Sequence, residues 1–564
     1  MLLSHHYYYL HNFRRAIDWV RQRYADVLDA TEIGFIDSFH HLPCMSQALL
    51  VRLLMRRGPW FLERKLGYAE IPSVSEAARP LLNLAWLDDE RPMSLQALFA
   101  LHTKPELLRL FPHASIRSST SKAHMLQTLL AAQDGEKTYR QWNPQSSDSA
   151  WCVTLGDLCE RLRLMFFGNL HQTWSEFVLA DLDIFKYEKV HFDAASRGFD
   201  CRADIDCYVA LDRCRQALTD GEAPAAVLLE AARCHSAAPW LEARRAKLLL
   251  RIGQACERAH HWELAEQAYG QCHYPGARHR HARVYERTGR FHEALALAQA
   301  AKAAPESEEE TQRTARMLPR LQRRLGQQVE LGSAHSRAAF LRQEDTLLEQ
   351  PRQPEPVERV VQKHLHSASA PVFYVENTLL NALFGLLCWP AIFAPLPGAF
   401  FHPFQSRPAD LYQNDFVLRR KPLFDACLDL LDDGSYQRIV RQRFADKYGV
   451  QSPFVAWKAL SDELLGLALD CIPPGHLKLV FLRMLRDLKG NRSGLPDLVR
   501  FWPAQRRYEL VEVKAPGDKL QDNQTRWLHY FSEHGIPALV CRVCWRDTAA
   551  VQQRERLHAT PIQA

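Results

Sequence analysis

The sequence predicts a mainly α-helical protein whose C-terminal part is an α/β domain built on a short sheet. Through roughly the first 350 residues, apolar side chains recur at the spacing of amphipathic helices. Two related segments recur there at a period of 29 residues, as in helical repeats. Near the C-terminus, one amphipathic helix candidate, Lys519–His534, lies among three β-like runs: Leu498–Trp502, Tyr508–Val513 and Ala538–Val543.

The bulk composition describes a multidomain globular protein. The chain has 564 residues, of which 47% are hydrophobic and 24% charged. Its net charge of +6 permits nucleic-acid binding without requiring it. Because the sequence contains neither a run of apolar residues long enough to span a bilayer nor the apolar core of a signal peptide, we expect no membrane association and a cytoplasmic location.

Residues 1–75 are expected to form a helical DNA-binding domain. Its third helix, Ser46–Arg57, ends in a basic stretch that Gly58 and Pro59 stop. Three arginines of this helix are candidates for contacts with DNA phosphates: Arg52, Arg56 and Arg57. An ordinary solvated helix face explains the same residues equally well, so both interpretations stay open.

The next segments are also predicted to be helical. Residues 76–132 carry SLQALFALHTKPELLRLF, whose leucine spacing suggests a compact DNA-binding fold of the SAP type. The polar stretch Gln133–Ala150 is the best linker candidate. Residues 151–350 contain the repeat, in which CERAHHWELA recurs as YERTGRFHEA, a tetratricopeptide-like (TPR-like) helix-hairpin pattern. Residues 303–355 are expected to form a charged helix and then a linker into a last domain at 357–545.

The candidate catalytic residues lie in the last domain. Asp497 opens the first β-like run, and Glu512 lies near the end of the second, with Lys514 two residues beyond it. Alternation along a strand places Glu512 and Lys514 on one face. If the two runs pair as a hairpin, two carboxylates and an ammonium converge, as a divalent metal and its water require. The alternative is ordinary solvated charge at strand ends.

A further acid lies upstream. Glu376 stands at the start of the apolar segment Val375–Leu387, which we expect to be a helix that Pro390 ends or kinks. A carboxylate beside an otherwise buried helix needs a partner or a metal, although a first-turn Glu favoured by the helix dipole is the simpler explanation. Lys489 and Arg492 lie in a basic loop that precedes Asp497.

These motifs resemble those of a known nuclease family. GLPDLV, VEVK and a glutamine-bearing helix are similar to the VRR-NUC module of the PD-(D/E)xK superfamily, which has a restriction-endonuclease-like fold. With VENTLLNALFGLL, nearly the whole chain resembles the Fanconi-associated nucleases. No cysteine–histidine pattern of the ubiquitin-binding zinc finger of animal members precedes residue 150, so a bacterial-type member without that finger is implied.

The resemblance implies a function and a partner. It implies a 5′-flap endonuclease and 5′→3′ exonuclease of the phosphodiesterase I type. Such an enzyme acts on branched or flapped DNA in DNA repair, with interstrand crosslink repair as the expected pathway. We expect a monomer that is associated with the nucleoid. Two alternatives stay open: a Holliday-junction-type resolvase, and a non-catalytic helical-repeat scaffold that binds DNA.

The resemblance also implies roles for individual residues. Metal ligands would be Glu376, Asp497, Glu512 and the carbonyl of Val513, which together would hold one or two Mg²⁺ or Mn²⁺ ions. Lys514 would be the catalytic lysine and Gln524 a supporting residue. Lys489 and Arg492 are the nearest candidates for binding the DNA backbone.

Overall fold

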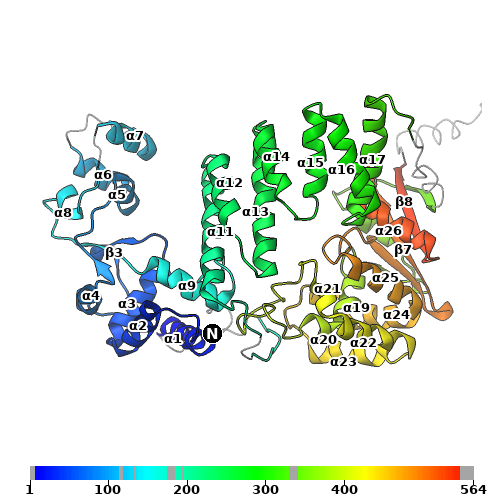
Figure 1. The fold of residues 1–564 in the computed structure, drawn as a ribbon. Coiled ribbons are helices and arrows are strands. Elements are labelled where there is room, and N and C mark those ends of the chain that lie inside the picture. The colour runs from blue at the N-terminus through cyan, green and yellow to red at the C-terminus, as the bar shows by residue number, and fades with distance from the viewer. Residues whose placement is uncertain are drawn as a thin grey trace, which may run out of the picture. The chain divides into compact units, whose positions relative to one another are not determined.

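The computed structural model has two compact units. It describes residues 7–112, 119–132, 135–174, 185–192, 196–329 and 341–546. The first unit comprises Met1–Lys186, Phe192–Val209 and Phe400–Phe404. The second comprises Tyr187–His191, Ala210–Ala399 and Gln405–Ala564. Figure 1 shows the mainly helical architecture and the C-terminal sheet, so the predicted fold class is confirmed.

The N-terminal part of the first unit is a helical bundle with a small antiparallel sheet. Its helices are α1 (Tyr8–Arg23), α2 (Ala30–His41), α3 (Cys44–Leu54), α4 (Val74–Asn83) and α9 (Gly156–Phe167), with a 3-10 turn at Glu63–Lys65. Its sheet has the order β1-β3-β2, with β1 Trp60–Leu62, β2 Leu87–Asp88 and β3 Ala150–Val153. Helix α3 ends three residues earlier than expected, so Arg56 and Arg57 lie in the turn beyond it.

Four short helices follow in the same unit: α5 (Leu95–Leu101), α6 (Lys104–Leu110), α7 (Lys122–Ala132) and α8 (Tyr139–Trp142). Ser94 and Thr138 cap the first and last of them. The expectation of a linker at Gln133–Ala150 is wrong for the part of it that the structure describes. Tyr139 and Trp142 are buried in the core of these helices, and the Trp142 indole donates to the Met93 carbonyl. Burial of aromatic residues outweighs the polar composition around them.

The repeat region is a row of antiparallel helices, in which neighbours in sequence stand side by side (Figure 1). It consists of α11 (Arg202–Asp220), α12 (Pro224–Arg233), α13 (Pro239–Arg258), α14 (Trp262–Gly270), α15 (Ala277–Arg287), α16 (Phe291–Ala303) and α17 (Glu308–Arg324). The two predicted helix hairpins are confirmed. His260 and Gly289, at equivalent repeat positions, both have left-handed backbones, with φ of 59° and 79°. These residues therefore form the same tight turn, and the His260–His261 pair lies at a helix corner.

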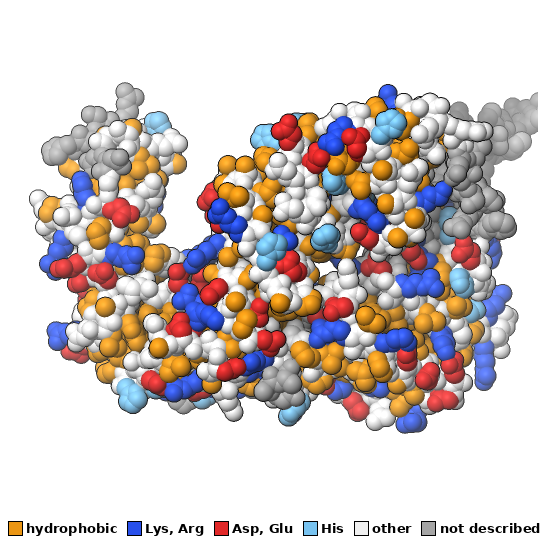
Figure 2. All heavy atoms as spheres, in the orientation of Figure 1, with side chains coloured by type: hydrophobic (Ala, Val, Ile, Leu, Met, Phe, Trp, Pro, Cys, Tyr) orange, Lys and Arg blue, Asp and Glu red, His pale blue; other side chains and the backbone are white. Residues whose placement is uncertain are grey.

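Positive charge in the repeat region is largely neutralised. On the face that Figure 2 shows, basic and acidic side chains are interspersed over these helices. Arg290 pairs with Glu266, and Arg320 pairs with Glu286. The local excess of arginine in the sequence is thus used mainly to join neighbouring helices.

A five-stranded mixed sheet with the order β4-β8-β7-β6-β5 forms the centre of the C-terminal domain. Its strands are β4 (Gln343–Leu348), β5 (Val372–Tyr374), β6 (Leu498–Trp502), β7 (Arg507–Lys514) and β8 (Ala538–Trp545). The expected hairpin is β6–β7, with Leu498 opposite Val511, and β8 pairs parallel to β7. The three predicted strands are confirmed. The expectation of a structureless linker before residue 357 is wrong, because β4 pairs with β8.

The helices of this domain are α18 (Val357–Leu365), α19 (Leu379–Leu387), α20 (Trp389–Ile392), α21 (Phe416–Arg419), α22 (Lys421–Asp432), α23 (Tyr436–Asp446), α24 (Asp462–Cys471), α25 (Pro474–Arg486) and α26 (Asp522–Glu533), with 3-10 turns at Trp457–Ala459 and Pro503–Gln505. Helix α19 is buried along its whole length, and Pro390 starts α20 as a separate turn. No single helix of the described residues combines the length and apolarity needed to cross a membrane; α24 and α25 pass only as a pair bent by 105°.

Candidate active site

Asp497 is fixed by the strands on both sides of it. It directly precedes β6, and its Oδ2 accepts a hydrogen bond of 2.8 Å from the Val513 backbone N–H of β7. Its own carbonyl accepts a second bond of 2.8 Å from the Val375 N–H. The carboxyl group is therefore held at the place where three segments, far apart in the sequence, meet.

Glu512 and Lys514 lie on one face of β7, as the alternation predicts. The Glu512 side chain is fully buried, and the Lys514 Nζ lies 2.7 Å from its Oε1. Its other oxygen, Oε2, has no hydrogen-bond partner among the described residues. A buried carboxylate with unsatisfied oxygens is costly unless a cation or donor completes its surroundings. The pair is thus suited to hold a cation.

The two buried acids hold protons more tightly than free side chains do. Burial raises the pKa of Asp497 to about 6, while the Val513 N–H and the Lys514 ammonium oppose the rise. Burial and the charge of Asp497 raise the pKa of Glu512 to about 7, again against Lys514. Crowded carboxylates of this kind disfavour one another's ionisation. A bound cation would relieve that repulsion.

Glu376 occupies a turn before α19 and is exposed, so the expectation of a helix from Val375 onward is wrong for the first four residues. The Tyr374 hydroxyl donates to Glu376 Oε2 at 2.5 Å, and the Asn377 amide donates to Oε1 at 3.2 Å. Asn377 has a left-handed backbone, with φ of 49°, and accepts a bond from the Leu495 N–H. The helix cannot start earlier because this turn connects β5 to the chain just before Asp497.

The three acids are close enough for their charges to interact. The charge of Glu376 contributes to the raised pKa values of both Asp497 and Glu512, and Glu358 of α18 contributes to that of Asp497. Within the described part of the chain, no three His, Cys, Asp or Glu side chains are grouped closely enough to ligate one ion by themselves. Oxygen-only donors that include the unpartnered Oε2 of buried Glu512 nevertheless fit a hard divalent cation, which adds water and carbonyl ligands.

The supporting residues have structural partners. Gln524 Oε1 accepts from the Gln521 N–H at 2.9 Å, so its side chain caps α26. Arg492 is partly buried and donates to the Tyr412 hydroxyl and, at 2.8 Å, to the Pro453 carbonyl. Lys489 is exposed, with its Nζ 3.5 Å from the Tyr274 hydroxyl.

The arginines of the first unit differ in availability. Arg52 is engaged by Glu70 at 2.6 Å, and its guanidinium carbon lies 4.0 Å from the centre of the Tyr9 ring. Arg56 and Arg57 are exposed. Of the three arginines proposed to contact DNA, these two are exposed enough to reach an external anion.

Sequence reasoning missed three residues near the acids: Tyr374, Asn377 and Glu358. Tyr374 lies on β5, a strand of three residues that is too short to produce an alternating pattern. Asn377 carried a local signal, since Asn is the residue after Gly that best tolerates a left-handed backbone. Glu358 lay on a short amphipathic helix and had no sequence feature that distinguished it.

Three family descriptions match the chain. The VRR-NUC domain matches residues 431–545, the FAN1 HTH domain residues 7–88, and the Fanconi anemia-associated nuclease SAP domain residues 92–142. The chain is 50% identical over 539 residues to the Fanconi-associated nuclease 1 homolog of Pseudomonas aeruginosa, which covers 96% of both chains. It is 23% identical over 590 residues to the homolog of Arabidopsis thaliana, covering 94% of this chain and 66% of that one.

Two solved structures have the same fold. Crystal structures of paFAN1 bound to 2nt and to 1nt 5′flap DNA with a gap superpose with TM-scores of 0.91 and 0.89. Both are 49% identical in sequence and cover 97% and 96% of this chain and 100% of the other. The fold and the site define a structure-specific DNA nuclease, a hydrolase of the restriction-endonuclease-like class. The sequence identity of 50% with the Pseudomonas relative, over nearly the full length, shows that this chain belongs to the Fanconi-associated nuclease family.

Proposed function

We propose that this nuclease is a 5′-flap endonuclease with 5′→3′ exonuclease action, working at the nucleoid on branched DNA during interstrand crosslink repair. The observation that supports the flap substrate is the likeness, at a TM-score of 0.91, to paFAN1 bound to a 5′ flap. The phosphate backbone positions such a substrate without reading its sequence, so recognition depends on the shape of the branch.

The acids and one carbonyl would hold the metal. Asp497, Glu512 and Glu376, with the Val513 carbonyl, are the proposed ligands of one or two Mg²⁺ or Mn²⁺ ions. When bound, such a cation lowers the pKa of water and neutralises charge on the scissile phosphate. The unpartnered Oε2 of the buried Glu512 side chain supports this assignment.

Lys514 has a separate role. Its ammonium, 2.7 Å from Glu512 and on the same strand face, is placed to orient the attacking water by donating a hydrogen bond to the water oxygen. The same positive charge offsets the negative charge that develops on the phosphate oxygens. Tyr374 and Asn377 hold the Glu376 carboxylate, so we assign them positioning roles. Gln524 would fix the start of α26 beside the site.

Cleavage assays on matched substrates test the proposal. Wild-type protein with Mg²⁺ should cut a 5′ flap in preference to a 3′ flap or a four-way junction, and chelation by EDTA should stop cleavage. Preference for the four-way junction would favour a resolvase, and metal-independent binding without cleavage of any substrate would favour a scaffold. Either result would overturn the proposal.

The first residue-level prediction concerns Asp497. Replacing it with Ala removes the carboxylate held by the Val513 N–H, and we expect loss of cleavage by at least about 1,000-fold with flap binding retained. Gel-shift and cleavage assays on one preparation measure both. A folded Asp497→Ala protein with full activity would contradict the assignment.

A further inference from the structure

A basic pocket lies in the first unit, between the turn after α3 and helices α5 to α7. Its volume is about 660 Å³, within the range of sites that hold small organic ligands. Among the side chains that line it are four cations: Arg56, Arg57, Lys65 and Lys122. No Asp or Glu lines it among the described residues. It joins the region matched by the HTH description to the region matched by the SAP description.

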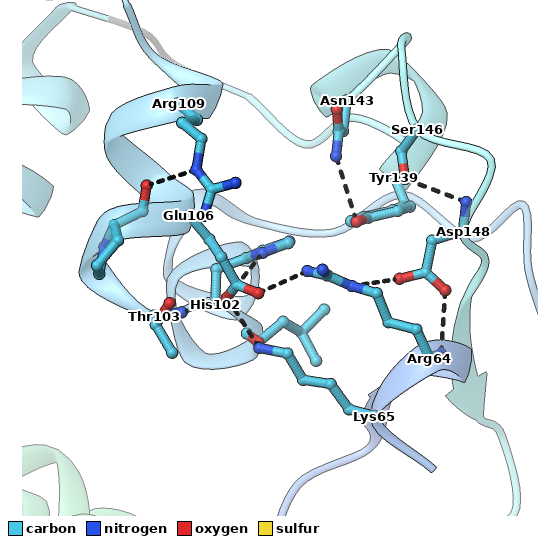
Figure 3. Close-up of polar contacts among 12 residues, drawn as sticks. Arg64, Lys65, His102, Thr103, Glu106, Arg109, Tyr139, Asn143, Ser146 and Asp148 are labelled. Atoms are coloured by element: carbon cyan, nitrogen blue, oxygen red, sulfur yellow. Dashed lines mark hydrogen bonds and ion pairs between the residues drawn. The ribbon is translucent and has the colours of Figure 1, made fainter. Parts of the chain in front are cut away.

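The neighbouring acids are already used by other cations. Arg64 pairs with Glu106 at 2.7 Å and with Asp148 at 2.9 Å, and Lys65 pairs with Glu106 at 2.9 Å. Figure 3 shows Arg64 and Lys65 pointing together toward Glu106. The described residues supply no carboxylate for Arg57 or Lys122, so the pocket keeps an excess of positive charge.

A buried histidine lines the same pocket without a hydrogen-bond partner. His102 is 3% exposed, and neither ring nitrogen has such a partner among the described residues. Its Nδ1 lies 3.5 Å from Glu106 Oε2, outside hydrogen-bonding geometry, and its ring stacks on Tyr139. Its backbone carbonyl accepts from Lys122 Nζ at 2.8 Å. An orphaned buried imidazole beside a lysine with no carboxylate partner in the described part of the chain points to a ligand that supplies the missing bond.

The rest of the lining is mostly apolar and includes two aromatic side chains. Trp60 and Phe61 line the pocket, and the Arg56 guanidinium lies 5.5 Å from the centre of the Phe61 ring. Cations beside aromatic faces are the combination by which proteins hold single-stranded nucleic acid, since phosphates meet the cations and bases stack on the rings.

We propose that this pocket binds one nucleotide of an unpaired DNA strand, with its phosphate at Arg57 and Lys122 and its base against Trp60. The proposal rests on the chain being a nuclease of branched DNA, whose substrates contain unpaired strands. It adds a second point at which the protein would recognise the single-stranded part of the branch.

Binding in a cleavage-dead background tests the pocket apart from the chemistry. The host is full-length Asp497→Ala protein, and the probe is a fluorescein-labelled ten-nucleotide thymidylate strand measured by anisotropy. Arg57→Gln with Lys122→Gln should weaken binding roughly tenfold and lower the salt dependence of log K by about 1.4. Arg79→Gln, an exposed arginine on α4 outside the pocket, is the matched control and should change binding less than twofold. If the double variant and the Arg79→Gln control weaken binding equally, the proposal is overturned.

Photocrosslinking locates the contact. A strand with one 5-iodo-deoxyuridine should crosslink to the tryptic peptide that contains Trp60, and excess unlabelled strand should suppress the product. Crosslinking only to other peptides overturns the proposal.

A competition experiment separates a strand from a free nucleotide. Thymidine monophosphate should not displace the labelled strand when the two are compared at the same nucleotide concentration. If it competes as well as the unlabelled strand, the ligand is a free nucleotide and the assignment to a strand fails. Because the host protein cannot cleave, neither outcome depends on the proposed flap polarity.

Discussion

At the scale of single residues, the site places a positively charged ammonium next to buried carboxylates. Lys514 lies 2.7 Å from a fully buried Glu512, which in turn shares a field with Asp497 and Glu376. The lysine therefore compensates charge that burial would otherwise make costly. The same geometry leaves Glu512 Oε2 available to a metal cation.

Replacing Lys514 with Met should separate chemistry from binding. The variant loses the ammonium but keeps most of the stem, so we expect kcat to fall by about 100-fold or more. The Kd for flap DNA should change by less than about threefold, because the lysine is mostly buried beside Glu512. Single-turnover cleavage and gel shift measure the two quantities. Lys519→Met, an exposed lysine nearby, should leave both unchanged.

His402 gives the first unit an acid-sensitive stability. Its ring packs against the rings of Phe166 and Phe167, with centroids 5.5 Å and 5.1 Å away, and burial lowers its pKa to about 3. Its Nδ1 accepts from the Phe404 N–H, so protonation breaks a bond as well as burying a charge. A histidine whose folded pKa is depressed stabilises fully above its unfolded pKa of about 6.5 and loses that contribution as pH falls toward 3.

The expected loss is on the order of 4 kcal/mol across that window. Hydrogen exchange in the first unit of the full-length protein, measured with increasing urea at several pH values between 6.5 and 4, should show that the free energy of unfolding falls as the pH falls. His402→Phe keeps an aromatic ring and should flatten the decline, whereas His11→Phe at an exposed position should not. An unchanged slope in His402→Phe would remove the histidine from the explanation.

At the scale of elements, the sequence predicts best where a pattern is local. The alternation in β6, β7 and β8 and the period of α26 depend on neighbouring residues, so all four elements were predictable. The turn at Glu376 was not, because it depends on a hydrogen bond from the Val375 N–H to the Asp497 carbonyl, more than a hundred residues away, and α19 starts only after this turn. Strand β4 likewise becomes a strand only by pairing with β8.

Alanine substitution at two helix glycines should change the free energy of unfolding in opposite directions. In α13, a Cβ on Gly253 would lie 2.4 Å from the Tyr269 ring, which packs against it from α14. Gly253→Ala should therefore destabilise the second unit by about 1–3 kcal/mol through overpacking. Gly466 in α24 has room, since the nearest atom is 3.7 Å away on a flexible Arg441 side chain.

Gly466→Ala should stabilise the protein by about 0.5–1 kcal/mol, because alanine loses less backbone entropy in a helix than glycine. Chemical unfolding of the two variants in parallel measures both signs. Destabilisation by both substitutions to the same extent would show that the close contact with Tyr269 is not the cause.

At the scale of the whole molecule, the second unit joins repeat helices to a catalytic sheet through α17. Glu308 at the start of α17 pairs with Arg483 of α25, and Arg316 pairs with Asp522 of α26. These pairs connect the repeat region to two helices, α25 and α26, of the domain that holds the catalytic sheet. Sequence reasoning separated the two regions because their patterns differ, and side-chain pairing across such a distance has no sequence signature.

The two ion pairs differ in burial, and burial decides how much each contributes to the free energy of unfolding. The Arg483 side chain is 5% exposed and its guanidinium carbon lies 4.7 Å from the Trp527 ring centre and 4.5 Å from that of Tyr530. Arg483→Ala removes a buried cation and its stacking, and should lower the free energy of unfolding by about 2–4 kcal/mol. Arg316 is 59% exposed, and Arg316→Ala should cost less than about 1 kcal/mol. Hydrogen exchange should show faster opening of α17 in Arg483→Ala alone, because that helix loses its buried attachment. Equal exchange in the two variants would mean that α17 is held by its apolar packing on α16 and not by the buried arginine.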